Sequence, residues 1–225
     1  MGMKQIDVIK STSYDQEEII KNIIKLHIPS GVIDCDPTYS IGNFYKKTGI
    51  EAPKYKFDIV PQAEGVEQAS ADKLPLENNS INSLLFDPPF LISVGPSLKQ
   101  TDASKKIDGK SNLIHQRFSS FESPKKLWDF YKASLEEGYR VLNENGVFIF
   151  KCQDTVSSSK QYFSHSYIMN IAVKIGFYPK DLFVLLAKNR MISGKHANQF
   201  HARKYSSWFW VFEKNNKGNK IDYFN

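Results

Sequence analysis

The apolar positions of the chain change their spacing along the sequence, and the first third shows two patterns. Between residues 16 and 28 the isoleucines follow helical spacing, and the Ser-Tyr-Asp-Gln stretch at 13–16 predicts a capping box at the start of that helix. The apolar runs at 32–35, 55–60 and 84–86 are short and are followed at once by Asp or Pro, which is typical of buried strands. The pattern predicts one helix and three strands.

The second half of the chain also alternates helix and strand. Ser123 and Pro124 provide an N-cap and a first-turn proline for a helix whose apolar residues, between Leu127 and Leu142, share one face. Asn145-Gly146 ends this helix. The spacing then predicts a buried strand at 146–152, a helix at 167–175, a buried strand at 181–187 and a final strand at 206–213.

Alternating strands and helices predict an α/β fold, in which a largely parallel sheet carries helices on both faces. The last two strands are joined by a basic segment without helical period, so the final strand should be antiparallel. With 41% hydrophobic and 24% charged residues, the composition is that of an ordinary soluble domain. We expect one domain over residues 1–225.

Several classes of protein are disfavoured by the composition. The longest apolar runs are far shorter than the roughly 20 residues that a membrane span requires, and residues 1–10 lack the apolar core of a signal peptide. We therefore expect a cytoplasmic chain with no membrane partner. Cys35 and Cys152 lie far apart in predicted strands, so we interpret both as buried apolar residues rather than as a disulfide or metal pair. No metal cluster is expected.

The charge of the chain is unevenly distributed. The formal net charge is +6, yet residues 1–90 carry −4, residues 91–126 carry +4 and residues 188–204 carry +5. The region at about 91–125 has no clear period and is rich in Ser, Lys and Gly, so we expect a mobile insertion that could act as a small recognition loop. Two localised basic segments indicate an anionic partner, nucleic acid being the obvious candidate. Solvated lysine-rich loops are the alternative.

The strand at 84–86 ends on Asp87-Pro88-Pro89-Phe90, an unusual sequence for a strand end. The carboxylate risks burial of a charge, and consecutive prolines remove two backbone donors and forbid helix. One of these residues would suffice as a stop signal. We therefore interpret the four residues as a candidate site, because ligands of open α/β sheets bind beyond the carboxyl ends of the strands.

Two further strand ends carry acidic residues. Asp36 begins "DPTYSIGNF", in which a turn containing Ser40 and Gly42 is expected to lead into a helix and to let a ligand approach the backbone. Asp58 ends the next strand, where a carboxylate can accept hydrogen bonds from ribose hydroxyls. Together these features favour a cofactor that contains a nucleoside.

The segments "DPTYSIGNF", "FDIV", "ADKLPL" and "LLFDPPF", in this order, resemble the S-adenosylmethionine-dependent amino-methyltransferases that modify adenine or cytosine in DNA. "GVFIFKCQD" and "HARKYSSWFWVF" resemble later motifs of compact phage-type members, and the likeness covers roughly residues 31–90 and 146–213. The resemblance implies S-adenosyl-L-methionine as cofactor and a Rossmann-like methyltransferase fold. That fold has a seven-stranded, mostly parallel sheet with an antiparallel last strand.

The resemblance also implies roles for individual residues. Asp87 and the carbonyl of Pro88 would grip the two N–H bonds of an exocyclic amino group, with Pro89 keeping the backbone rigid and Phe90 stacking on a flipped base. The residues implied to bind the cofactor are Tyr14, Asp36, Pro37, Thr38, Ser40, Gly42, Asp58, Ile59, Asp72 and Lys73.

The basic segments supply the candidate contacts to nucleic acid. We expect both segments to overhang the sheet edge at which the base enters. Lys151 and Gln153, at a strand end, are interpreted as contacts to the flipped nucleotide or as ordinary solvated residues. The full set of candidate nucleic-acid contacts is Lys99, Lys105, Lys106, Lys110, Arg117, Lys151, Lys188, Arg190, Lys195, His196, Arg203 and Lys204.

Adenine N6 in DNA is the expected target, since Asp at the first position of the tetrad is commoner in adenine enzymes of this resemblance. Amino groups of RNA guanine or adenine, cytosine N4 in DNA, and a non-catalytic nucleic-acid-binding subunit are the alternatives. A nicotinamide-dependent enzyme would need G-x-G-x-x-G, which "DPTYSIGNF" lacks. Ser40 stands where the family usually has glycine. No recognition domain of normal size is expected after the catalytic core, so sequence specificity would come from short loops, a homodimer or a separate specificity subunit, or would be low.

Overall fold

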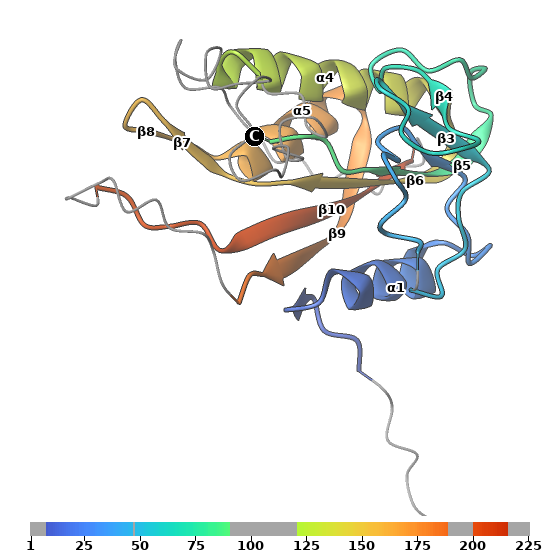
Figure 1. Cartoon of the computed structure of the whole chain (residues 1–225), viewed down its shortest axis with the longest axis horizontal. Helices are drawn as coiled ribbons and strands as arrows, with labels where there is room; N and C mark the ends of the chain where they lie inside the picture. Colours follow the sequence, from blue (N-terminus) through green and yellow to red (C-terminus); the bar gives the residue numbers. More distant parts are fainter. Residues whose placement is uncertain (1–7, 47, 91–120, 189–199, 216–225) are drawn as a thin grey trace, which may run out of the picture.

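The computed structural model describes residues 8–46, 48–90, 121–188 and 200–215 (Figure 1). In chain order the elements are β1 (Thr12–Ser13), α1 (Gln16–His27), β2 (Cys35–Asp36), β3 (Tyr55–Asp58), β4 (Glu67–Gln68), β5 (Ile81–Phe86), α4 (Pro124–Val141), β6 (Leu142–Cys152), β7 (Thr155–Ser157), β8 (Lys160–Tyr162), α5 (Ser164–Ile175), β9 (Phe177–Leu186) and β10 (Ser206–Lys214).

The described strands form one large sheet in the order β1-β9-β10-β6-β5-β2-β3-β4, and β7 and β8 pair in a separate hairpin. Within the large sheet β10 is antiparallel to both of its neighbours, β6 and β9, and every other pairing is parallel. The predicted Rossmann-like α/β fold with an antiparallel last strand is thereby confirmed. The described sheet has one strand more than the expected seven, and its two edges are the two-residue strands β1 and β4.

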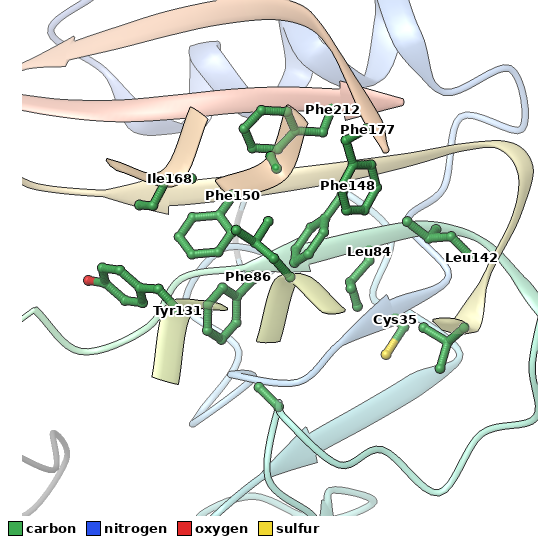
Figure 2. Packing of buried hydrophobic residues seen from close by; sticks show 14 of the residues in the cluster. Cys35, Leu84, Phe86, Tyr131, Leu142, Phe148, Phe150, Ile168, Phe177 and Phe212 are labelled. Carbon is green, nitrogen blue, oxygen red and sulfur yellow. The ribbon is translucent and has the colours of Figure 1, made fainter. Parts of the chain in front are cut away.

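Helices cover both faces of the sheet, with α4 and α5 on one face and α1 on the other (Figure 1). Phe86 of β5 and Phe148 and Phe150 of β6 pack with α4 and α5, whereas Leu85 and Ile149 pack with α1. Figure 2 shows the first group, in which the ring centroids of Phe86 and Phe150 lie 4.8 Å apart. Burial on both faces explains why these strands read as continuous apolar runs.

The helix caps differ in how well the sequence predicted them. The N-cap of α1 is Asp15, whose carboxylate accepts the N–H of the second helical residue at 2.9 Å. The capping box predicted to start at Ser13 is wrong, because Ser13 lies in β1, which pairs with β9. The N-cap of α4 is Ser123 with Pro124 in the first turn, as predicted. The predicted end of this helix at Asn145-Gly146 is wrong, because α4 ends at Val141 and these two residues belong to β6.

The expected helix after the first strand is absent from the described residues 37–46, which form turns. Ser40 and Gly42 have positive φ angles of 52° and 73°, values that interrupt a right-handed helix. A Cβ at Gly42 would lie 2.6 Å from the ring of Tyr39, so this turn requires glycine for space as well as for conformation. The turn holds the chain close to the end of β2.

Two other expectations concern the cysteines and the membrane. Cys35 and Cys152 are buried free cysteines, as predicted, and burial raises the pKa of each thiol. Within the described ranges, no helix has the length and apolar character needed to cross a membrane.

Candidate active site at the carboxyl ends of β2, β3 and β5

The site lies where the direction of strand order changes. From β2 the chain adds β3 and β4 on one side, and then returns to add β5 and β6 on the other. Cys35 of β2 is in register with Tyr55 of β3 and Leu84 of β5, so the carboxyl ends of the three strands meet at one edge. Ligands of open α/β sheets bind at such a switch point.

A pocket of about 340 Å³ occupies this edge, within the range of roughly 300–1,000 Å³ usual for small-molecule sites. Its walls come from the turn after β2, the ends of β3 and β5, the segment around β4 and helix α4. The residues predicted from sequence that line it are Pro37, Thr38, Ser40, Asp58, Ile59, Asp87 and Pro89.

Sequence reasoning missed half of the lining. The missed residues lack a chemical motif, although Val60 is adjacent to a predicted residue and could have been included. Phe130 lies on α4, far from every strand end in the sequence, and only the fold brings it to the pocket. The missed lining residues are Val60, Gln62, Ala69, Ser70, Ala71, Phe121 and Phe130.

Asp36 is buried beneath the pocket, with 1% of its surface exposed. Its Oδ1 accepts hydrogen bonds from the N–H and the hydroxyl of Thr38 at 2.9 and 3.0 Å, and its Oδ2 accepts one from the Tyr45 hydroxyl at 2.9 Å. Burial raises the pKa of Asp36 to about 7, and these hydrogen bonds oppose that shift. The structure therefore places Asp36 as a support of the turn, behind the pocket wall.

Thr38 connects this support to the tetrad. Its Oγ1 donates to Asp36 and accepts the backbone N–H of Asp87 at 2.9 Å. The hydroxyl thus joins the turn after β2 to the end of β5, two segments that are 49 residues apart. This contact fixes the backbone at the first residue of Asp-Pro-Pro-Phe.

Asp58 lines the pocket at the end of β3 and orders the loops around it. Its Oδ2 accepts the N–H of Ser40 and its Oδ1 accepts the N–H of Val60, each at 2.9 Å. A carboxylate has about four acceptor positions, so Asp58 retains acceptor capacity toward the pocket. Beside it, Ile59 and Val60 expose 55% and 59% of their surfaces, which leaves apolar area at the mouth of the pocket.

Asp87 lies in the pocket wall and is paired with Lys151. The ammonium of Lys151 donates to Oδ2 of Asp87 at 2.9 Å and to Oε1 of Gln16 at 2.8 Å. The parallel register of Phe86 with Phe150 brings the two charged residues to adjacent positions. Among the described residues, no donor contacts the other carboxylate oxygen, Oδ1.

The lysine of this pair is enclosed by protein. Its side chain is 9% exposed, against 21% for Asp87, and its ammonium lies 5.3 Å from the ring centroid of Phe44 and 5.5 Å from that of Phe209. The aromatic faces favour the cation. Lys151 was predicted as a contact to nucleic acid, and the structure instead places it inside, as the partner of Asp87.

The remaining predicted site residues lie outside the pocket lining. Tyr14 is exposed beside the start of α1, and Gly42 is buried in its turn. Asp72 and Lys73 are exposed, with the Asp72 carboxylate accepting the hydroxyl of Ser70, a lining residue. Pro88 is buried and Phe90 half-buried next to the lining residues Asp87 and Pro89.

The predicted basic contacts divide into two groups. Lys188, Arg203 and Lys204 are described, and the register of Leu186 with Ser206 places them beyond the sheet edge that carries Asp87. The Gln153 amide donates to the hydroxyl of Ser207 at 2.6 Å. The predicted contacts that lie outside the described residues are Lys99, Lys105, Lys106, Lys110, Arg117, Arg190, Lys195 and His196.

Comparisons with known proteins were made for the whole chain. No protein-family model matches it, and no curated protein matches it. Among solved structures, a SAM-dependent methyltransferase of Thermotoga maritima is 16% identical with a TM-score of 0.43, over 85% of this chain and 86% of that one. A SAM-dependent methyltransferase of Archaeoglobus fulgidus is 14% identical with a TM-score of 0.46, over 88% and 94%.

A third similar structure is a protein of Thermus thermophilus assigned as a DNA modification methylase, in complex with S-adenosyl-L-methionine. It is 12% identical with a TM-score of 0.36, and the match covers 65% of this chain. The match spans about half, 53%, of that longer protein. At these identities and TM-scores, the function of this chain has to be inferred from its own residues.

Proposed function

We propose that this protein transfers a methyl group from S-adenosyl-L-methionine to the exocyclic amino group of a nucleic-acid base, with N6 of adenine in DNA as the first candidate. The observation that carries the proposal is that Asp87 and Pro89 of the Asp-Pro-Pro-Phe tetrad line the same pocket as Asp58. A candidate acceptor for the amino group and a candidate ribose ligand thus face one cavity.

The residues of the pocket fit the cofactor. Asp58 has spare acceptor positions for ribose hydroxyls, and Ile59 and Val60 offer exposed apolar surface for a flat adenine ring. The described lining contains no Lys, Arg or His, so none of its side chains carries a positive charge that would repel a cationic cofactor. When bound, S-adenosyl-L-methionine would supply a methyl group activated by a positively charged sulfonium, the S–CH3 bond would break to leave S-adenosyl-L-homocysteine, and the methylated nitrogen would lose one N–H proton.

Asp87 provides the group that the acceptor base needs. An exocyclic amino nitrogen shares its lone pair with the ring, so it is a weak nucleophile until its N–H bonds are held by acceptors. Oδ1 of Asp87 is the carboxylate oxygen that no described donor occupies, and the carbonyl of Pro88 is the second acceptor that we infer. The Thr38 hydroxyl holds the backbone of Asp87, and Lys151 holds its Oδ2.

Phe90 is assigned to stack on the base, which has to leave a duplex to reach the pocket. The choice of adenine follows from the resemblance of the tetrad, in which Asp in first position is commoner in adenine enzymes. The same acceptor pair would serve amino groups of RNA, so the nature of the nucleic acid is decided by experiment. A second subunit or a homodimer for sequence specificity is part of the proposal.

Transfer of tritium from labelled S-adenosyl-L-methionine tests the proposal. The purified chain is incubated with duplex DNA, single-stranded DNA and RNA of matched sequence, and the modified nucleoside is identified by mass. We expect N6-methyladenosine or its deoxy form with the parent, and no product with Asp87→Ala, whose cofactor affinity should be unchanged by calorimetry. Cofactor binding without transfer to any nucleic acid would instead support a non-catalytic subunit.

A further inference from the structure

Two described segments, residues 155–165 and residues 200–205, extend from the sheet edge that carries Asp87, and we call them the ledge. The first follows β6 and contains the β7–β8 hairpin, and the second leads into β10. Because Cys152 of β6 is in register with Trp208 of β10, both segments leave the sheet at the edge where β5 ends in Asp87. Figure 1 shows the hairpin and the start of β10 projecting on the same side of the molecule.

A hydrogen bond joins the two parts of the ledge. The imidazole Nε2 of His201 lies 3.0 Å from the carbonyl oxygen of Ser159, at the tip of the hairpin. Behind the hairpin, His165 stacks on Trp208 with ring centroids 4.4 Å apart, which connects the start of α5 to β10. The ledge is therefore continuous across segments that lie about 40 residues apart in the sequence.

The ledge exposes aromatic rings. Phe163 exposes 53% of its surface and Phe200 exposes 82%, and the ring of Tyr205 is also exposed. Exposure of apolar rings to water is unfavourable. Exposed apolar rings on two segments that are hydrogen-bonded to each other indicate a surface on which a partner packs.

The charge of the ledge has a single sign. Residues 155–165 and 200–205 contain Lys160, Arg203 and Lys204, and neither segment contains Asp or Glu. The adjacent Asp154 is buried, and its carboxylate is hydrogen-bonded to Nδ1 of His165 at 2.8 and 2.9 Å. The exposed charge therefore favours a polyanion.

We propose that the ledge binds an unpaired stretch of nucleic acid next to the target base. Exposed aromatic rings stack on bases, and lysine and arginine pair with the phosphates between them, which is the combination that binds single strands. In a duplex the faces of the bases are stacked on one another, so the rings of Phe163 and Phe200 would have no base to stack on. This inference rests on the proposed function and narrows its substrate to a base in a single-stranded or opened region.

Fluorescence anisotropy with labelled 12-nucleotide strands tests the inference in the absence of cofactor. The probes are single-stranded DNA, single-stranded RNA and the DNA duplex, and the variants are Phe163→Ala with Phe200→Ala, and Arg203→Ala with Lys204→Ala. The matched control, Lys25→Ala with Leu26→Ala, removes one exposed charge and one exposed apolar residue from α1 on the other face. Circular dichroism confirms that each variant is folded.

We expect the parent to bind single strands more tightly than the duplex. The aromatic variant should bind single strands about tenfold or more weakly, since each base stacked on an aromatic ring contributes roughly 1–3 kcal/mol, and its salt dependence should be unchanged. The basic variant should lower the slope of log K against log salt by about 1.4, at roughly 0.7 for each lost phosphate contact. The α1 control should bind as the parent does.

The inference would be overturned if the aromatic variant bound single strands as tightly as the parent does. It would also be overturned if this variant lost as much affinity for the duplex as for single strands. The comparison of the two single strands shows whether DNA or RNA is preferred. The result is independent of the proposed chemistry, because binding is measured without methyl transfer. If the parent protein binds single strands through the ledge but transfers no methyl group, only the proposed function is refuted. If the ledge variants transfer methyl groups and bind single strands with the affinity of the parent, only the proposed role of the ledge is refuted.

Discussion

The ammonium of Lys151 lies 2.9 Å from Oδ2 of Asp87 and ties that carboxylate to the neighbouring strand. The same ammonium is bonded to Gln16, the first residue of α1, so three elements meet at the proposed acceptor residue. A carboxylate held at one oxygen keeps its other oxygen in a defined direction. We interpret Lys151 as a positioning residue for Asp87.

Replacement of this lysine tests its positioning role. We expect Lys151→Met to lower kcat for methyl transfer by roughly 10- to 100-fold, because small displacements of a reacting group have effects of this size. The KM for the cofactor should change little, since Lys151 is absent from the pocket lining. Steady-state kinetics with separate titration of cofactor and nucleic acid gives both values.

Lys180→Met is the matched control for the loss of an ion pair. Lys180 is bonded to Glu213 at 2.9 Å, between β9 and β10 and away from the pocket. Its replacement should leave kcat unchanged. If Lys151→Met and Lys180→Met reduced kcat equally, the effect would be one of stability and the positioning role of Lys151 would be wrong.

The cofactor proposal predicts different effects for two acidic residues. Asp58→Ala removes the acceptor of two backbone N–H groups and the proposed ribose ligand, so affinity for S-adenosyl-L-methionine should fall about tenfold or more. Asp72→Ala, at an exposed residue outside the lining, should change affinity less than threefold. Isothermal titration calorimetry measures both, and equal losses would restore Asp72 as a cofactor ligand.

The buried carboxyl of Asp36 predicts a pH dependence of stability. Its pKa of about 7 in the folded protein lies above the ordinary value of 3.8, so the folded protein binds its proton more tightly than the unfolded chain. The free energy of unfolding should therefore fall as pH rises from about 4 to about 7, by on the order of 4 kcal/mol in total.

Asp36→Asn should remove this part of the pH dependence. An asparagine oxygen can still accept from Thr38, and the Tyr45 hydroxyl can accept from the amide. Urea unfolding at pH 5 and pH 8 is the measurement, with Asp129→Asn at an exposed helix position as the control. A parent and an Asp36→Asn variant with parallel profiles would show that the burial of Asp36 has no such cost.

The contact between α4 and β6 predicts the effect of a single methyl group. A Cβ at Gly138 would lie 2.4 Å from Phe148 and 3.2 Å from Leu84, both in the core. Gly138→Ala should destabilise the protein by about 1–3 kcal/mol despite the better helix propensity of alanine. Lys132→Ala, on the exposed side of α4, should stay within about 0.5 kcal/mol. Thermal unfolding of the two variants compares them.

The sequence predicted the elements whose residues bury apolar side chains. β5, β6, β9 and β10 were found because their inward residues form continuous apolar runs, and α4 because its cap and its apolar face agree. β4 was missed because Glu67 and Gln68 are polar and exposed. The β7–β8 turn was missed because Ser158 and Ser159 adopt positive φ without the glycine or asparagine that usually marks such a turn.

The sequence predicted those residues of the candidate site that carry a carboxylate at the end of a strand, such as Asp58 and Asp87. Its supports depend on contacts across the sheet, which residue type alone does not reveal. The pairing of Asp87 with Lys151 could have been inferred from the sequence. Each residue directly follows a phenylalanine of an apolar run, and the two runs form the adjacent strands β5 and β6. The burial of Asp36 could not have been inferred from the sequence, because it depends on the position of Tyr45, which folds back over the turn.

The insertion of β10 between β6 and β9 has a consequence for biosynthesis. Until residues 206–214 have been translated, the strand that lies between β6 and β9 is missing. Each of these two strands then has one unpaired edge. The strands β1 and β9 can join the rest of the sheet only after β10, up to Lys214, has emerged, and Phe209, whose ring lies near the ammonium of Lys151, arrives with β10. Completion of the sheet is therefore a late event in the synthesis of each molecule.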